Sequence, residues 1–154
     1  MKNLLFLFLI LVTAKVSAQR LSVKDLITIQ ESKLVDVEDI IFKFGFELTD
    51  IEDDQYNYAK EELGQSNPEI ISFKYLNNKI SGTTLVINSA NYYGYIKDTL
   101  IDQGFEHKTT DNIDGMLCHR YINNTQTYTI LLLQYKVRSE NCYGIILDNI
   151  AYQE

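Results

Sequence analysis

The sequence predicts an α+β protein made of two αβββ repeats, with helices packed on one face of antiparallel sheet of about six strands. Two stretches, Val35–Glu47 and Tyr92–Glu106, are amphipathic helices that end on Gly-Phe-Glu, and these endings lie 59 residues apart. The strand-like segment Leu85–Ile87 returns 60 residues later as Ile145–Leu147. The connections between the predicted strands are too short for parallel crossovers, which favours antiparallel meanders. Whether the strands form one sheet or two stays open at this point.

Residues 1–18 predict a signal peptide for Sec-dependent export, followed by one duplicated domain over residues 19–154. Lys2 precedes the apolar run Leu4–Val12, which is far shorter than the roughly 20 residues of a membrane-spanning helix. Val16 and Ala18 stand at the −3 and −1 positions of a cleavage site. We therefore expect a periplasmic or secreted protein that keeps no membrane attachment after cleavage. An uncleaved N-terminal anchor is the alternative.

The composition limits the classes of partner. The 154 residues carry a net charge of −7, which argues against nucleic acids and anionic membranes as partners, because both require a basic face. Eleven tyrosines and seven phenylalanines, with a single proline, favour a sheet with short turns over disorder.

Repeat one covers about residues 22–88. Ser22 and Asp25 predict a helix N-terminus close to a capping box. A second helix spans Leu34–Phe44, and Gly45 supplies the left-handed residue that ends it. After a polar turn, three strands follow. The predicted turn is Thr49–Asp54, and the predicted strands are Gln55–Glu62, Glu69–Leu76 and Gly82–Asn88.

Repeat two covers about residues 89–154 and begins with a helix capped by Ser89 or Asn91. The buried stripe of this helix is predicted to hold Tyr93, Ile96, Leu100 and Ile101. A polar loop and three strands complete the repeat. The predicted loop is Lys108–Asp114, and the predicted strands are Gly115–Ile122, Thr125–Lys136 and Cys142–Ile150.

An exported chain with two cysteines invites a disulfide, here between Cys118 and Cys142. If Asn123 and Asn124 form a hairpin turn, Cys118 lies opposite about Thr129, and Cys142 lies opposite about Tyr135 or Lys136. Those positions are roughly 20 Å apart along a strand, whereas a disulfide needs Cα atoms within about 7 Å. We therefore expect two unpaired thiols.

Candidate catalytic groups are few. The chain has two histidines, His107 and His119, and no nucleophile elbow, zinc-protease, phosphate-loop or Cys-x-x-Cys motif. Glu47 and Glu106 recur after the two Gly-Phe turns, but duplication explains their recurrence without catalysis. We expect no enzyme. The alternative is a small exported hydrolase that uses Glu47, Glu106 or His119.

The acidic run Asp50, Glu52 and Asp54, followed by Glu61, resembles the oxygen spacing of an EF-hand calcium loop. Gln55 stands where that loop needs glycine, and no second helix follows. The interpretation we favour is a solvated turn, with no metal and no cofactor; a calcium-stabilised module is the weaker alternative.

The segment Thr127–Tyr135 is apolar at odd and even positions alike, although a sheet covered by helices on one side should be polar on the other. One interpretation is a shielded central strand. The functional interpretation is a sheet face that binds a protein or peptide partner, and we select it as the site hypothesis. Its predicted contact residues are Tyr128, Ile130, Leu132, Tyr121 and Tyr58.

The tandem arrangement of a helix followed by an antiparallel meander resembles the architecture of β-lactamase inhibitor proteins and, more distantly, the saddle of TATA-binding proteins. The resemblance covers the chain after residue 18 in topology, without a shared motif. It implies an exported protein that binds a partner and catalyses no reaction. The identity of the partner and the oligomeric state do not follow from it.

Overall fold

The computed structural model describes residues 20–61 and 67–150, and the structural statements below concern these residues. The described part contains three helices and eight strands. The helices are α2 (Val23–Glu31), α3 (Leu34–Lys43) and α4 (Ala90–Asp102). The strands are β1 (Glu47–Glu52), β2 (Gln55–Lys60), β3 (Glu69–Leu76), β4 (Lys79–Ile87), β5 (Phe105–Ile113), β6 (Met116–Asn123), β7 (Tyr128–Val137) and β8 (Glu140–Asn149).

All eight strands form one antiparallel sheet in the order β1-β2-β3-β4-β8-β7-β6-β5. The α+β class is confirmed, but the expected number of about six strands is wrong. The predicted polar turn Thr49–Asp54 and the predicted polar loop Lys108–Asp114 belong to the hairpins of the two edge strands, β1 and β5. Every residue of β1, and every residue of β5 after Phe105, is exposed. These strands therefore lack the alternation of apolar residues by which a half-buried strand is recognised.

The strand order is symmetric about the central β4–β8 pair; the first half runs two helices and four strands, and the second runs one helix and four strands. Leu85 pairs directly with Ile145, the residue 60 positions later that matches it in the sequence repeat. The edge strands also share an irregularity, because the register shifts between Leu48 and Asp50 in β1 and between His107 and Thr109 in β5. Each half therefore has four strands in place of the three expected from αβββ repeats.

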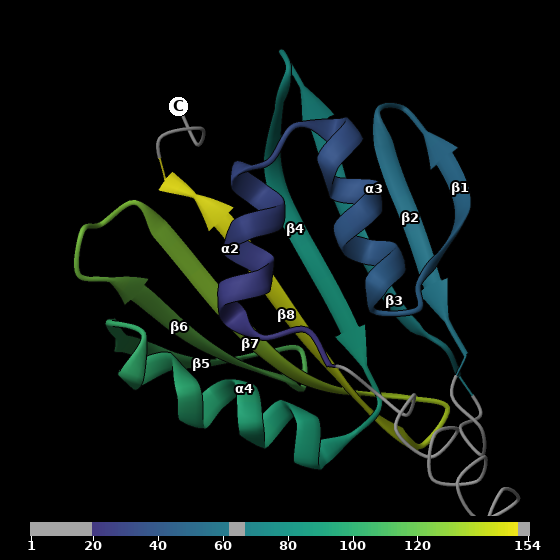
Figure 1. Ribbon diagram of the computed structural model, residues 1–154. Helices are drawn as coiled ribbons and strands as arrows, with labels where there is room; N and C mark the ends of the chain where they lie inside the picture. Colours follow the sequence, from purple (N-terminus) through teal and green to yellow (C-terminus); the bar gives the residue numbers. More distant parts are fainter. Residues whose placement is uncertain (1–19, 62–66, 151–154) are drawn as a thin grey trace, which may run out of the picture.

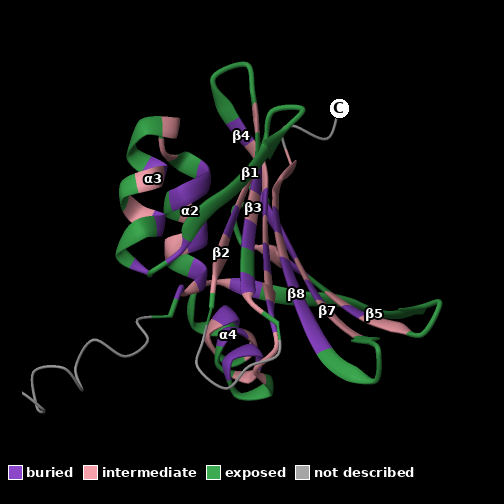
Figure 2. Cartoon of the chain, turned by 90° about the vertical axis from the view of Figure 1, so that its right-hand side faces the viewer, coloured by how far each residue is buried: buried purple, intermediate pink, exposed green. Residues whose placement is uncertain are grey.

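The three helices lie on the same side of the sheet (Figures 1 and 2). The core fills the space between them and the sheet, so strand residues alternate between this helix-covered face and the opposite face, here called the open face. Helix side chains in the core include Leu26, Val37, Ile41 and Ile96, all fully buried. The strands contribute Ile71, Phe73, Leu85, Ile130, Leu132, Ile145 and Leu147.

The predicted helix ends are present. Ser22 and Asp25 form a capping box, and Ser89, not Asn91, caps α4 by accepting a hydrogen bond of 3.2 Å from the Tyr92 backbone N–H. Gly45 and Gly104 have φ values of +83° and +80° and redirect the chain into β1 and β5.

The buried stripe of α4 differs from the prediction at two residues. Tyr93, Ile96 and Leu100 are buried as expected, but Ile101 is 72% exposed. Tyr92 takes its place in the core, where its hydroxyl donates a 2.7 Å hydrogen bond to the Leu21 carbonyl.

The β6–β7 hairpin is longer than expected, because Ile122 pairs with Thr129 and the connection runs through residues 124–127. Cys118 therefore lies opposite Leu133 and not Thr129, while Cys142 lies opposite Tyr135 as expected. Both thiols are free and buried. They stand on two strands separated by β7, so the thiols stay unpaired for a different geometric reason from the one the sequence suggested.

Candidate functional site

The five predicted contact residues lie on the helix-covered face and are buried. Tyr58, Ile130 and Leu132 are fully buried, and Tyr121 and Tyr128 keep 5% and 7% of their surface exposed. The prediction therefore selected the wrong set of alternate positions on β7. Because these side chains form the core, they are not available to a partner in this structure.

Two of these tyrosines are held by acidic groups from the helices. The Tyr128 hydroxyl donates to Glu31 Oε1 at 2.7 Å, and the Tyr58 hydroxyl donates to Glu38 Oε1 at 3.4 Å. Burial, reinforced by the nearby Glu38 carboxylate, raises the pKa of Tyr58 to about 12. The Tyr58 phenol therefore stays neutral at physiological pH, and both hydroxyl contacts connect the helices to the sheet.

The other side chains of β7 lie on the open face. The β7 residues Leu131 and Leu133 are only partly buried, and their neighbours on adjacent strands are also apolar. We call this group the open-face strip. It consists of Val86, Ile122, Leu131, Leu133, Tyr135 and Ile146. Within the described residues, all three helices pack on the opposite side, so no helix covers the strip.

Strand register extends the strip across the whole sheet. One line of directly paired residues crosses all eight strands on the open face, and its six central members are small or apolar. A carboxylate stands at each end. In order, the line is Glu47, Ala59, Ile70, Val86, Gly144, Leu133, Cys118 and Asp111.

Gly144 shapes the middle of this line. A Cβ atom at Gly144 would lie 3.3 Å from Leu133 Cδ1, so the missing side chain leaves room for Leu133 to lean over β8. Cys118 and Cys142 also lie on the open face, with 8% and 5% of their surface exposed. Burial raises the pKa of the Cys118 thiol, as does the nearby carboxylate of Asp111. The Cys118 thiol therefore acts as a small apolar group, whereas the Cys142 thiol donates to Asn88 Oδ1 at 3.6 Å.

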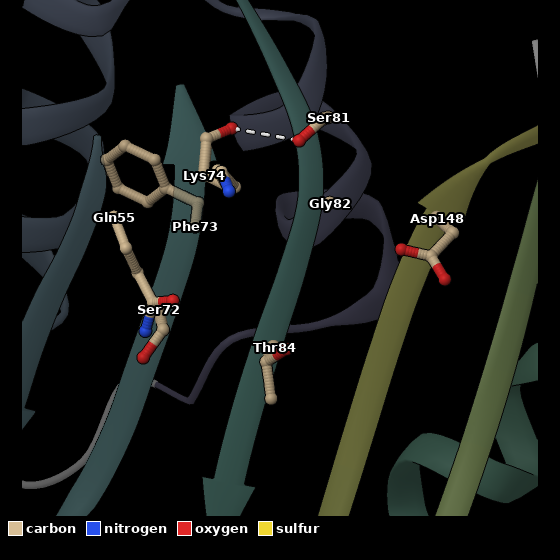
Figure 3. Close-up of a pocket in the computed structure, with 8 residues that line it drawn as sticks. All are labelled: Gln55, Ser72, Phe73, Lys74, Ser81, Gly82, Thr84 and Asp148. Carbon is tan, nitrogen blue, oxygen red and sulfur yellow. Dashed lines mark hydrogen bonds between the residues drawn. The ribbon is translucent and has the colours of Figure 1, made fainter. Parts of the chain in front are cut away.

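A polar depression of about 380 Å³ adjoins the strip on the open face of β2, β3, β4 and β8. Figure 3 shows its lining, in which Asp148 points toward Gly82. A Cβ atom at Gly82 would lie 2.7 Å from Asp148 Oδ1, so glycine is needed for the carboxylate to occupy this place. Burial raises the pKa of Asp148. The remaining polar side chains are those of Gln55, Ser72, Lys74, Ser81 and Thr84.

The candidate acid–base groups are dispersed. Glu47 and Glu106 lie on β1 and β5, the two opposite edges of the sheet, so the structure does not bring them together. Glu106 is exposed and forms an ion pair with Lys108 at 2.6 Å, which lowers the pKa of its carboxyl group. Glu47 and Glu106 therefore cannot act as a catalytic pair of carboxylates in this structure.

The two histidines lie close together on the helix-covered side of the β5–β6 hairpin. Thr110 Oγ1 is 2.9 Å from His107 Nε2 and 2.9 Å from His119 Nδ1. Burial, followed by the positive charge of Lys97 on α4, lowers the pKa of His119. The sequence could not indicate this cluster, since the histidines are separated by eleven residues and meet only through the hairpin.

The acidic run does not form a calcium loop. Asp50 and Glu52 lie on β1, and Asp54 lies in the β1–β2 turn with a φ of +63°. Among the residues that the structure places, no group of three or more histidine, cysteine or acidic side chains has the arrangement of a metal site.

Comparison with known proteins assigns no family, because no family model, curated protein or solved structure matches this chain. Over residues 20–61 and 67–150, none of the helices is long and apolar enough to cross a membrane. The predicted signal peptide lies outside the described residues.

Proposed function

We propose that this protein is an exported, non-enzymatic binding protein that recognises a protein partner through the open face of its sheet. The main support for the proposal is the line of directly paired residues that crosses all eight strands on the open face. It has six small or apolar residues between Glu47 and Asp111. A one-sided sheet normally presents polar residues to water, and contiguous exposed apolar surface marks interaction sites. The expectation of export comes from residues 1–18.

The charges around the strip suggest the chemistry of the partner. Both edge strands place carboxylates on the open face, with Glu47, Asp50 and Glu52 on β1 and Asp111 on β5. The chain as a whole carries a net charge of −7. On the β5–β6 side, Lys108 and Arg120 accompany the carboxylates. A complementary partner surface therefore has an apolar centre with basic side chains facing β1, because charge complementarity speeds encounter and suppresses wrong partners.

Several apolar residues at the margin of the open face are well exposed, including Leu76 at 40%, Val137 at 45% and Ile113 at 53%. They extend the apolar surface beyond the strip toward the strand ends. The resemblance in topology to β-lactamase inhibitor proteins supports the same class of function, and only by analogy.

Site-specific photo-cross-linking in the producing cell tests the proposal. A photoreactive residue placed at Ile70 or Arg120 on the open face should form one discrete adduct with another protein. The same residue at Val35 or Ile101, which are 71% and 72% exposed on the helix layer, is the control and should form none. Adducts only from the helix layer, or adducts with the mass of two copies of this chain, would contradict the proposal.

A further inference from the structure

The β5–β6 hairpin brings together the only two histidines of the chain, on the side of the sheet away from the open face. His107 Nε2 and His119 Nδ1 both lie 2.9 Å from Thr110 Oγ1, so the two nitrogens are directed at one point. The ring centroids are 6.0 Å apart.

The register shift in β5 produces the convergence. His107 and Thr110 are three residues apart, and in a regular strand their side chains would point to opposite faces. The irregularity between His107 and Thr109 places both on the helix-covered side, where His107 pairs with Tyr121 and Thr110 pairs with His119.

Repeat one has the same backbone but not the same side chains. Its β1–β2 hairpin has a register shift at the equivalent place, and Leu48 pairs there with Tyr58 as His107 pairs with Tyr121. The counterparts of Thr110 and His119 are Ile51 and Tyr56. The fold therefore tolerates leucine, isoleucine and tyrosine at these three positions, and the histidine cluster is not required by the architecture.

The shared hydroxyl fixes the protonation pattern of the neutral pair. Thr110 has a single hydroxyl proton and can donate it to only one ring, so the other ring must donate its own N–H to Oγ1. One of the two facing nitrogens therefore carries a proton and the other presents a lone pair. Moving that one proton to the far nitrogen of its ring directs two lone pairs at the same point.

We propose that His107 and His119 form a two-histidine site for a borderline divalent transition-metal ion such as Zn²⁺, Ni²⁺ or Cu²⁺. Imidazole nitrogens suit these ions, whose Zn–N bonds are about 2.0–2.1 Å long. For an ion at the present Oγ1 position, each nitrogen needs to move closer by less than about 1 Å, a shift that rotation of the two histidine side chains supplies. The Thr110 hydroxyl rotates aside to make room for the ion, and water completes the coordination.

The charges near the site predict its selectivity. Burial, followed by the positive charge of Lys97 on α4, lowers the pKa of His119, and the same positive charge disfavours an ion held by charge alone. Hard cations such as Mg²⁺, which require oxygen ligands, should therefore not bind. Coordination by the two imidazole nitrogens is needed to overcome this repulsion.

Titration of the untagged protein with ZnCl2 or NiCl2 by isothermal calorimetry tests the site, with MgCl2 as the negative control. We expect saturable binding of one Zn²⁺ or Ni²⁺ per chain and none of Mg²⁺. His107→Ala and His119→Ala should each weaken the metal affinity by at least about 10- to 100-fold. Loss of a residue that only supports a metal ligand already costs that much, and these two residues are themselves ligands. In ¹⁵N spectra of the imidazoles, Zn²⁺ should shift both histidines together.

The triple variant H107L/T110I/H119Y gives repeat two the side chains of repeat one, so it should fold and lose metal binding. Binding that persists in this folded variant would place the metal elsewhere and overturn the proposal. An absence of saturable binding to the unmodified chain would also overturn it. Neither result bears on the open face, because the two sites share no residue.

Discussion

The two faces of β7 show how one strand can serve two purposes. Ile130 and Leu132 point toward the helices and are fully buried, whereas Leu131 and Leu133 point away from them and are only partly buried. The side chains are similar in size and hydrophobicity, so the difference lies in what covers them. Burial by the helices turns one set into core, and the absence of a helix from the other side within the described residues leaves the second set for a different use.

Matched alanine substitutions on β7 should give the largest difference between the faces. Ile130→Ala and Leu132→Ala each delete buried methyl groups and should lower the free energy of unfolding by about 2–5 kcal/mol. Leu131→Ala and Leu133→Ala delete groups that are only partly buried and should cost less, about 1–2 kcal/mol. Urea unfolding monitored by circular dichroism measures all four variants. Equal losses on the two faces would contradict the assignment of a single core.

The helix-ending glycines keep the helices against the covered face, and they should have the next largest effect. Gly45→Ala and Gly104→Ala force an L-residue to a φ near +80° and should each cost about 1–2 kcal/mol. Gly94→Ala is the matched control within α4. A Cβ atom there meets nothing within 4 Å, so alanine should stabilise by about 0.5–1 kcal/mol.

Thermal or urea unfolding of these three glycine variants separates backbone strain from packing. If Gly94→Ala raises the free energy of unfolding and Gly104→Ala lowers it, the result supports the role of the left-handed glycines in ending the helices. A loss of stability in Gly94→Ala as large as that in Gly104→Ala would sink this explanation.

The smallest effect concerns the polar end of the open face and depends on pH. Burial raises the pKa of Asp148 above its ordinary value of 3.8, so the folded state binds this proton more tightly than the unfolded state. Stability from this group is therefore full below pH 3.8 and is lost as the pH rises through the folded-state pKa. Asp148→Asn should be more stable than the unmodified protein at pH 7, and this gain should vanish at about pH 3.5. A gain that is constant across this range would exclude titration of Asp148 as its cause.

The sequence predicted the parts of the fold that leave a periodic signal. The helix caps at Ser22 and Ser89, the glycines that end α3 and α4, and the central strands follow from local residue patterns. The repeat offset of 60 residues even indicated which residues match, and Leu85 and Ile145 turned out to pair across the centre of the sheet. The caps and the helix-ending glycines depend on local geometry that neighbouring residues determine, and the pairing of Leu85 with Ile145 follows from the repeat.

The edge strands and the covered face did not follow from the sequence. In β1 and β5, pairing is held by hairpin turns and backbone hydrogen bonds, and the exposed residues show no alternation. In β7, apolar residues occupy both faces, so periodicity could not indicate which face the helices cover. Tertiary packing decides which face is covered. The sequence therefore predicts a surface with Ile130 and Leu132, whereas Leu131 and Leu133 form that surface in the structure.

The most direct test of the central claim is the affinity of the open face for the protein captured by cross-linking. In the double variant L131S/L133S, we expect the dissociation constant to rise by at least about tenfold, since hot-spot residues each contribute more than 1 kcal/mol. Ile101→Ser on the helix layer should leave it unchanged. A double variant that stays folded and binds with unaltered affinity would contradict recognition through the open face.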